Sequence, residues 1–101
     1  MGRSALFRPL VEKDPANPLF RFSLGQELLK EEAAAEAIPH LAFAAGAKSD
    51  WMVPRILLGK AQLALGDRAA AKAAFESALA LAVAQGHEEP EEELRALLAG
   101  L

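Results

Sequence analysis

The chain repeats its key residue types at one fixed spacing, and this repetition constrains the fold more than any other feature. The pair Leu24 and Gly25 returns 34 positions later as Leu58 and Gly59. The same spacing links further residues of matching kind, which are Ala37 with Ala71, Leu41 with Phe75, and Ala44 with Ala78. A period of this size is typical of arrays in which one supersecondary unit stacks on the next. Small residues at regular positions indicate that the unit is a hairpin of two closely approaching helices.

Composition favours helices throughout. Of the 101 residues, 52% are hydrophobic and 25% are charged, which is typical of a soluble, globular chain. Much of the apolar fraction is alanine, the strongest helix former, and β-branched residues are scarce. The length suits one domain. We therefore expect a single all-α domain.

Both copies of the repeated segment resemble tetratricopeptide repeats, whose pattern is a Leu-Gly pair in the first helix followed by spaced small and aromatic residues in the second. The copy from Met52 to Leu81 fits well, including Gly66-Asp67 at the turn. The earlier copy has Glu32 where the turn glycine is expected, and Pro39 lies inside its second helix. The resemblance implies a right-handed superhelical stack of antiparallel helical hairpins, an α-solenoid of about five helices.

We divide the chain into an N-terminal segment (1–17), a first repeat (18–51), a second repeat (52–86) and a capping helix (87–101). The N-terminal segment is open to two interpretations, a remnant of a preceding second helix that acts as a lid, or a frayed tail. The glutamates at the start of the last segment suit the positive end of a helix dipole, and Glu91 can pair with Arg95 one turn later.

Helix starts are predicted from capping residues. Asn17 followed by Pro18 is a strong start signal, Ser49 or Asp50 should cap the first helix of the second repeat, and Asp67 should cap the helix after it. Pro39 removes a helical hydrogen bond, so its helix either starts late, near Ala35, or is bent.

No constellation of residues for catalysis or for cofactor binding is visible. The chain has no cysteine, and its glycines are spread singly, so thiol chemistry and a phosphate-binding loop are excluded. His40, with Glu36 one turn before it, and His87 are interpreted as solvated histidines rather than metal ligands, and the run from Glu88 to Glu93 as a helix start. Dispersed lysines and arginines argue against nucleic acid, and no segment reaches membrane-spanning length. We expect a non-enzymatic cytoplasmic protein without cofactor or metal.

Function is therefore expected on the surface that the repeat family presents to partners. In the family this is the concave side lined by first helices, here called the first-helix face. By position it comprises Leu19, Phe22, Gln26, Leu29, Lys30, Val53, Ile56, Lys60 and Leu63. Family members that grip carboxylate-ended tails use Lys and Asn on this face, and Phe22 and Gln26 stand there instead. That class of ligand is not expected.

The leading hypothesis is a non-catalytic module that binds a protein or peptide partner through this apolar face. The alternatives are a homodimer in which an identical copy closes the groove, and a groove filled by the chain's own N-terminal segment or capping helix. Trp51 either plugs the joint between the repeats or stands exposed as an anchor for a partner.

Overall fold

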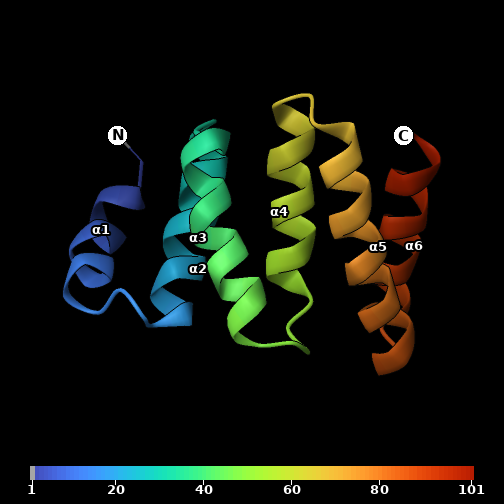
Figure 1. Ribbon diagram of the computed structural model, residues 1–101, viewed down its shortest axis with the longest axis horizontal. Coiled ribbons are helices and arrows are strands. Elements are labelled where there is room, and N and C mark those ends of the chain that lie inside the picture. The colour runs from blue at the N-terminus through green and yellow to red at the C-terminus, as the bar shows by residue number, and fades with distance from the viewer. Residues whose placement is uncertain (1) are drawn as a thin grey trace.

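The computed structural model describes residues 2–101; Met1, the first residue of the N-terminal segment, lies outside the described range. Residues 2–101 form helices and no strand, which confirms the all-α fold (Figure 1). Six helices occur in this range: α1 (Ser4–Lys13), α2 (Pro18–Lys30), α3 (Ala34–Ala47), α4 (Val53–Ala64), α5 (Arg68–Gln85) and α6 (Glu88–Ala99).

The helices stand side by side in a row and make two central hairpins with a single helix at each end (Figure 1). The hairpins are α2 with α3 and α4 with α5, and α3 packs against α4 to join them. At the N-terminal end α1 packs on α2, and at the C-terminal end α6 packs on α5. The expected number of about five helices is exceeded by one because the N-terminal segment forms a full helix.

Close contacts within the hairpins explain the repeated small residues. A Cβ atom added to Gly25 would lie 2.8 Å from the Leu41 Cγ, and one added to Gly59 would lie 2.4 Å from the Phe75 Cε1. These distances are far below a van der Waals contact, so the two helices can approach only because the side chain is missing. All the repeat-defining residues are buried except Leu58, which is half-buried: Leu24, Gly25, Ala37, Leu41, Ala44, Leu58, Gly59, Ala71, Phe75 and Ala78.

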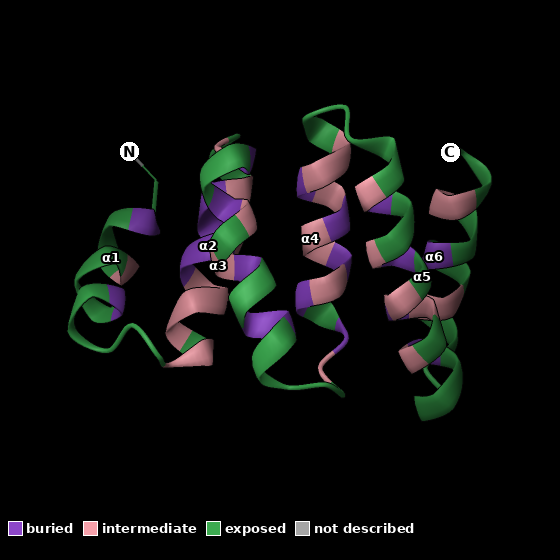
Figure 2. Ribbon diagram, viewed as in Figure 1, coloured by how far each residue is buried: buried purple, intermediate pink, exposed green. Residues whose placement is uncertain are grey.

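The buried side chains form two clusters, one for each hairpin. Figure 2 marks the buried residues in purple along the helices. The first joins α1, α2, α3 and α4 around Leu24, Leu28 and Leu41, with Val11 and Ala61 at its edges. The second joins α4, α5 and α6 in a cluster of Met52, Ile56, Ala71, Phe75, Ala78, Ala82 and Leu94. Since α1 and α6 each contribute buried residues, both end helices are integral parts of the stack.

Two of the three predicted helix caps are confirmed. The Asn17 side chain accepts hydrogen bonds from the backbone N–H of Leu19 and Phe20, and Asp67 accepts one from Ala70. The prediction that Ser49 or Asp50 caps α4 is wrong. Residues 49 and 50 lie in a turn, and α4 begins at Val53 with Pro54 in its first turn, where the proline's missing N–H leaves one donor fewer to satisfy.

The turn of the first hairpin contains a strained residue. Glu32 has a backbone φ of 63°, in the left-handed region, and Gly66 at the equivalent point of the second hairpin has a φ of 81°. The two turns therefore have the same geometry, although only the second uses glycine. Pro39 lies within α3, which begins at Ala34, one residue from the late start near Ala35 that was one of the two predicted alternatives.

Two equivalent arginines, here called the arginine hooks, tie each first helix to its surroundings. In the first repeat the Arg21 Nε donates to the Pro15 carbonyl at 2.8 Å, and its guanidinium lies 4.5 Å from the centre of the Phe43 ring. In the second, the Arg55 Nη2 donates to the Ser49 carbonyl at 3.2 Å and its Nη1 donates to the Ser77 hydroxyl. The 34-residue period relates the two hooks position by position: Pro15 corresponds to Ser49, Arg21 to Arg55, and Phe43 to Ser77.

Candidate functional site: the first-helix face and a cleft at the hairpin turns

One end of the first-helix face is open to solvent. Leu19, in the first turn of α2, is 54% exposed, and Val53, at the start of α4, is 40% exposed. Phe22 lies three residues after Leu19 and is therefore its neighbour on the helix surface. Together with Trp51, these residues form what we call the open strip.

Trp51 connects the two halves of the open strip. Its ring centroid lies 4.8 Å from that of Phe22, with the two planes inclined by 46°. The Lys48 Nζ lies 5.4 Å from the centre of the indole, on a surface where both rings are only partly buried. Trp51 thus occupies the joint between the repeats and still presents part of its ring to solvent.

Beyond Val53, the residues that the second repeat contributes to the face are half-buried or buried. Ile56 is only 7% exposed and belongs to the buried cluster that includes Leu94 of α6, and Leu63 packs against the same cluster. The Lys60 Nζ lies 3.4 Å from a carboxylate oxygen of Glu93, also on α6. On this half of the face Ile56 and Leu63 thus belong to the second core cluster and Lys60 pairs with α6, whereas the open strip stays exposed.

Both lysines of the face have acidic neighbours. In addition to the Lys60 contact, the Lys30 Nζ lies 3.2 Å from Glu27, whose carboxylate also lies 3.6 Å from Arg3. Gln26 and Leu29 are half-buried between these charges and the first cluster. A ligand carboxylate at either lysine would therefore compete with an acidic neighbour, and most of the remaining face is apolar.

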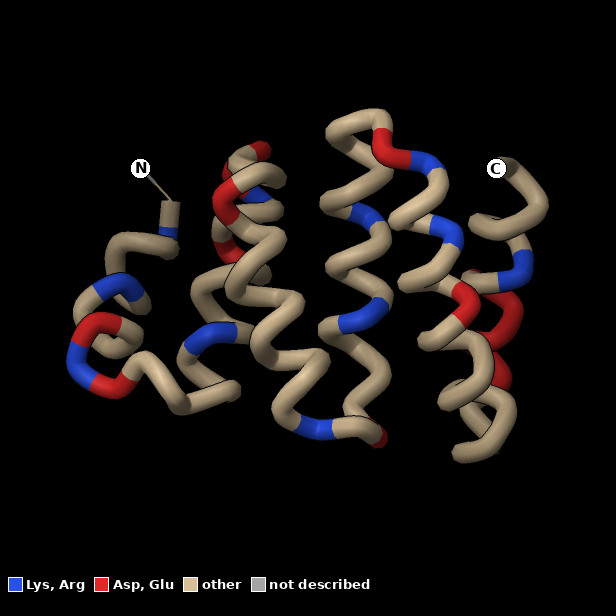
Figure 3. Tube along the Cα trace, viewed as in Figure 1, with Lys and Arg blue, Asp and Glu red and all other residues tan. Residues whose placement is uncertain are grey.

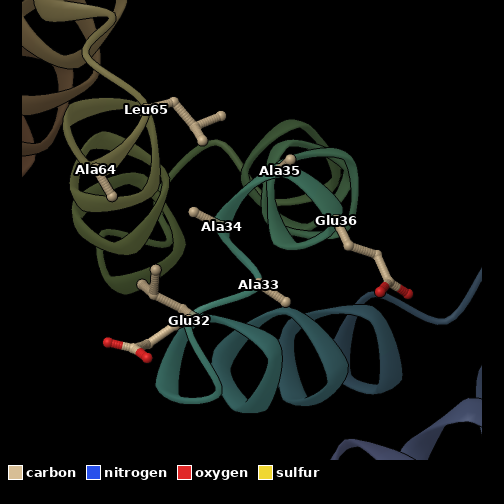
Figure 4. Close-up of a pocket in the computed structure, with 8 residues that line it drawn as sticks. Glu32, Ala33, Ala34, Ala35, Glu36, Ala64 and Leu65 are labelled. Carbon is tan, nitrogen blue, oxygen red and sulfur yellow. The ribbon is translucent and has the colours of Figure 1, made fainter.

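A cleft of about 590 Å³ lies at the opposite end of the face, between the two hairpin turns. Figure 4 shows Ala34 and Ala64 facing each other across it, with Leu65 on one side and Glu32 on the other. We call it the turn cleft, and it is lined by Leu29, Glu32, Ala33, Ala34, Ala35, Glu36, Ala64 and Leu65. Only Leu29 belongs to the set predicted to bind a partner. In the sequence Glu32 stands out as a departure from the glycine pattern, but this departure does not by itself indicate a cleft.

Carboxylates gather at this end of the stack (Figure 3). Glu31 accepts hydrogen bonds from the Ser4 backbone N–H at 2.9 Å and from the Ser4 hydroxyl at 2.8 Å, and these bonds lower its pKa. Glu36 is bound by the Arg8 guanidinium, which lowers the pKa of that carboxyl. Two of the three neighbouring carboxylates are therefore already engaged by α1.

The two histidines do not assemble a metal site. The His40 Nδ1 lies 3.5 Å from the Arg21 guanidinium, and burial together with this positive charge lowers the pKa of His40. Among residues 2–101, no group of three or more His, Asp or Glu side chains is placed to hold a metal ion. Within the same range, no helix is both long and apolar enough to span a membrane.

Comparisons with solved structures place this architecture among known proteins. PcrH, solved in complex with the chaperone binding region of PopD, superimposes with a TM-score of 0.87 at 24% identity over 96% of this chain and 74% of that one. The first TPR of Spaghetti (RPAP3), bound to the HSP90 peptide SRMEEVD, gives a TM-score of 0.79 at 21% identity, over 96% of this chain and 75% of that one. At these identities the likeness concerns the fold.

Sequence comparisons extend the likeness to the family. Protein BPP2914 from Bordetella parapertussis has a TM-score of 0.79 and 32% identity, over 95% of this chain and 84% of its own. No family model matches the chain. The TPR repeat-containing protein PA0015 of Pseudomonas aeruginosa is 35% identical over 89 residues, which cover 88% of this chain and 85% of that protein. With this identity and coverage added to the stacked hairpins, the chain belongs to the tetratricopeptide-repeat family.

Proposed function

We propose that this protein is a non-catalytic module that binds an extended or helical segment of a partner protein on its first-helix face. The observation that carries the proposal is the open strip, in which Leu19 and Val53 expose apolar side chains beside the Phe22–Trp51 pair. Exposed apolar patches on otherwise charged surfaces commonly mark contact sites, and tryptophan is enriched where binding energy is concentrated.

The chemistry of the strip favours apolar anchors in the ligand. Lys30 and Lys60 already pair with Glu27 and Glu93, so a ligand carboxylate would have to compete with these partners. The aromatic pair and its aliphatic neighbours can instead receive leucine-like or aromatic side chains spaced along a peptide. The complexes of PcrH with a region of PopD and of RPAP3 with an HSP90 peptide support this role, because both proteins have the same fold and bind segments of another chain.

Selection from a random peptide library, followed by NMR mapping, tests the proposal. We expect selected peptides to shift backbone amide signals of α2 and α4 around the open strip, and Leu19→Glu with Val53→Glu to abolish binding. Both substitutions place a carboxylate in the first turn of a helix, where the dipole tolerates it, so the fold should persist. Leu6→Glu is the matched control, since Leu6 is also exposed in a first turn but lies on α1.

The alternative is self-association through the same strip. Sedimentation equilibrium separates the two functions, because a homodimer would dissociate in the Leu19→Glu, Val53→Glu variant and a monomer would show no change in mass. A wild-type monomer whose selected peptides bind outside α2 and α4 would contradict both.

A further inference from the structure

The turn cleft lies next to the first-helix face but differs from the open strip in shape and charge. Leu29 belongs to both the face and the cleft, so a ligand on α2 can extend continuously from one to the other. The walls are apolar, formed by Leu29, Ala34, Ala64 and Leu65, and Leu65 is 54% exposed. An exposed leucine above two alanines leaves space for an aliphatic side chain from a ligand.

The charged residues that line the cleft are all negative. Its lining contains two glutamates and no lysine, arginine or histidine. Glu36 is engaged by Arg8, and in Figure 4 its carboxylate points away from Ala34 and Ala64. Glu32 forms no ion pair among residues 2–101, which leaves it as the uncompensated charge at the rim. A ligand group of positive charge is the natural complement.

The backbone conformation of Glu32 is a second reason to assign this residue a role. Its φ of 63° is the conformation that the second hairpin assigns to Gly66, whose φ is 81°. A residue with a side chain is disfavoured in this region, and such strained positions cluster at sites where the side chain has a role. The first hairpin turn thus carries the Glu32 carboxylate beside the cleft, whereas the second hairpin turn has Gly66, which has no side chain, at the equivalent position.

We propose that the turn cleft is a specificity subsite for a peptide segment in which an aliphatic side chain neighbours a lysine or arginine. The aliphatic group fills the space between Ala34, Ala64 and Leu65, and the cation pairs with the Glu32 carboxylate. The inference rests on the proposed function, since the segment reaches the cleft as an extension of a ligand on the first-helix face. The expected ligand is therefore a peptide segment that is both basic and apolar.

Two blocked dodecapeptides serve as probes, one built from alternating leucine and lysine spaced by alanine, the other its twin with glutamate in place of each lysine. We expect the lysine peptide to bind about tenfold more tightly in fluorescence anisotropy, as one charge-assisted contact allows. It should shift amide signals of residues 32–36 and 64–65 in NMR spectra. Glu32→Gln, which keeps the size and removes the charge, should cancel the preference.

Matched controls separate the subsite from general attraction to an acidic protein. Glu76→Gln removes an exposed carboxylate from α5, and should leave the preference intact. Leu65→Ser should weaken both peptides, whereas Val83→Ser should weaken neither, because Val83 is 51% exposed on α5 and lies outside the cleft. Equal losses in Glu32→Gln and Glu76→Gln, or no loss in Leu65→Ser, would overturn the inference.

The same titrations distinguish failure of the subsite from failure of the proposed function. Suppose that binding is lost in the Leu19→Glu, Val53→Glu variant but is unchanged in Glu32→Gln and in Leu65→Ser. The first-helix face would then remain the binding site, and the subsite would be refuted. Binding that is weakened by the cleft substitutions but unchanged by the open-strip substitutions would support the turn cleft and refute the first-helix face as the binding site. Absence of binding by both peptides would overturn the subsite, while the library selection still decides the face.

Discussion

Gly59→Ala tests the close contact on which the second hairpin depends. The added Cβ would lie 2.4 Å from the Phe75 Cε1, 2.6 Å from its Cδ1 and 3.0 Å from its Cζ. Phe75 is fully buried in the second cluster, between residues of α4, α5 and α6, so its ring has no free space to enter. The two helices must separate or the ring must leave its preferred rotamer.

The magnitude follows from two opposing effects. Alanine in a helix interior is favoured over glycine by about 1 kcal/mol, whereas overpacking a core by one carbon costs about 1–3 kcal/mol. Contacts this short with a rigid ring place the cost near the upper end. The net loss in free energy of unfolding should be about 1–2 kcal/mol, which lowers the Tm of a domain of this size by about 5–15 °C.

Thermal and urea unfolding followed by far-UV circular dichroism measure the loss. Gly46→Ala is the control, because a Cβ at Gly46 in α3 meets nothing within 4 Å, and it should raise stability by a few tenths of a kcal/mol or more. In a Phe75→Leu background the cost of Gly59→Ala should shrink, since the substitution removes the rigid ring that the added Cβ meets at 2.4 Å. A gain in Gly59→Ala similar to that in Gly46→Ala, or no coupling with Phe75→Leu, would refute the reasoning.

Three further predictions concern the turn, the hooks and the half-buried His40. Glu32→Gly should raise the free energy of unfolding by about 1 kcal/mol by relieving the left-handed strain, whereas Glu31→Gly, which loses the Ser4 hydrogen bonds, should lower it in the same urea titrations; two equal effects would contradict the assignment of strain to Glu32. Arg55→Met should cost about 1–3 kcal/mol because the Ser49 carbonyl and Ser77 hydroxyl lose a charged donor, and an unchanged urea midpoint would show that the hook contributes nothing. Burial and Arg21 lower the pKa of His40, so the unfolded chain binds this proton more readily and stability should fall as the pH decreases below about 6.5. His40→Gln should flatten that part of the stability profile, and an identical slope in the variant would exclude His40 as its source.

The sequence sufficed for the hairpins because their geometry depends on residue size. Gly25, Gly59, Ala37 and Ala71 can be recognised from the 34-residue period, and the helix contacts confirm why they must be small. The same period extends to Phe7, which stands 34 positions before Leu41 and packs against the first cluster. This signal would have identified α1 as a helix, since it places the N-terminal segment in the position of a second helix.

The candidate site was harder to predict because it depends on how the end of the chain folds back. Assigning Ile56 to the first-helix face by position treats α4 as if nothing followed it. Ile56 is instead only 7% exposed and belongs to a buried cluster that also contains Leu94 of α6. The turn cleft could not be anticipated either, because it joins residues of two turns whose separation depends on the packing of α3 against α4.

The arginine hooks would allow the number of repeats in this architecture to change. Each hook ties its own repeat to the loop just before it, from Pro15 to Phe43 in one case and from Ser49 to Ser77 in the other, and Arg55 also reaches the Ala45 carbonyl at 3.5 Å. A further copy of residues 18–51 inserted after Trp51 would bring its own arginine, its own loop carbonyl and its own acceptor. The stack could then grow by gene duplication without inventing a new joint, and each added unit would lengthen the surface available to a partner.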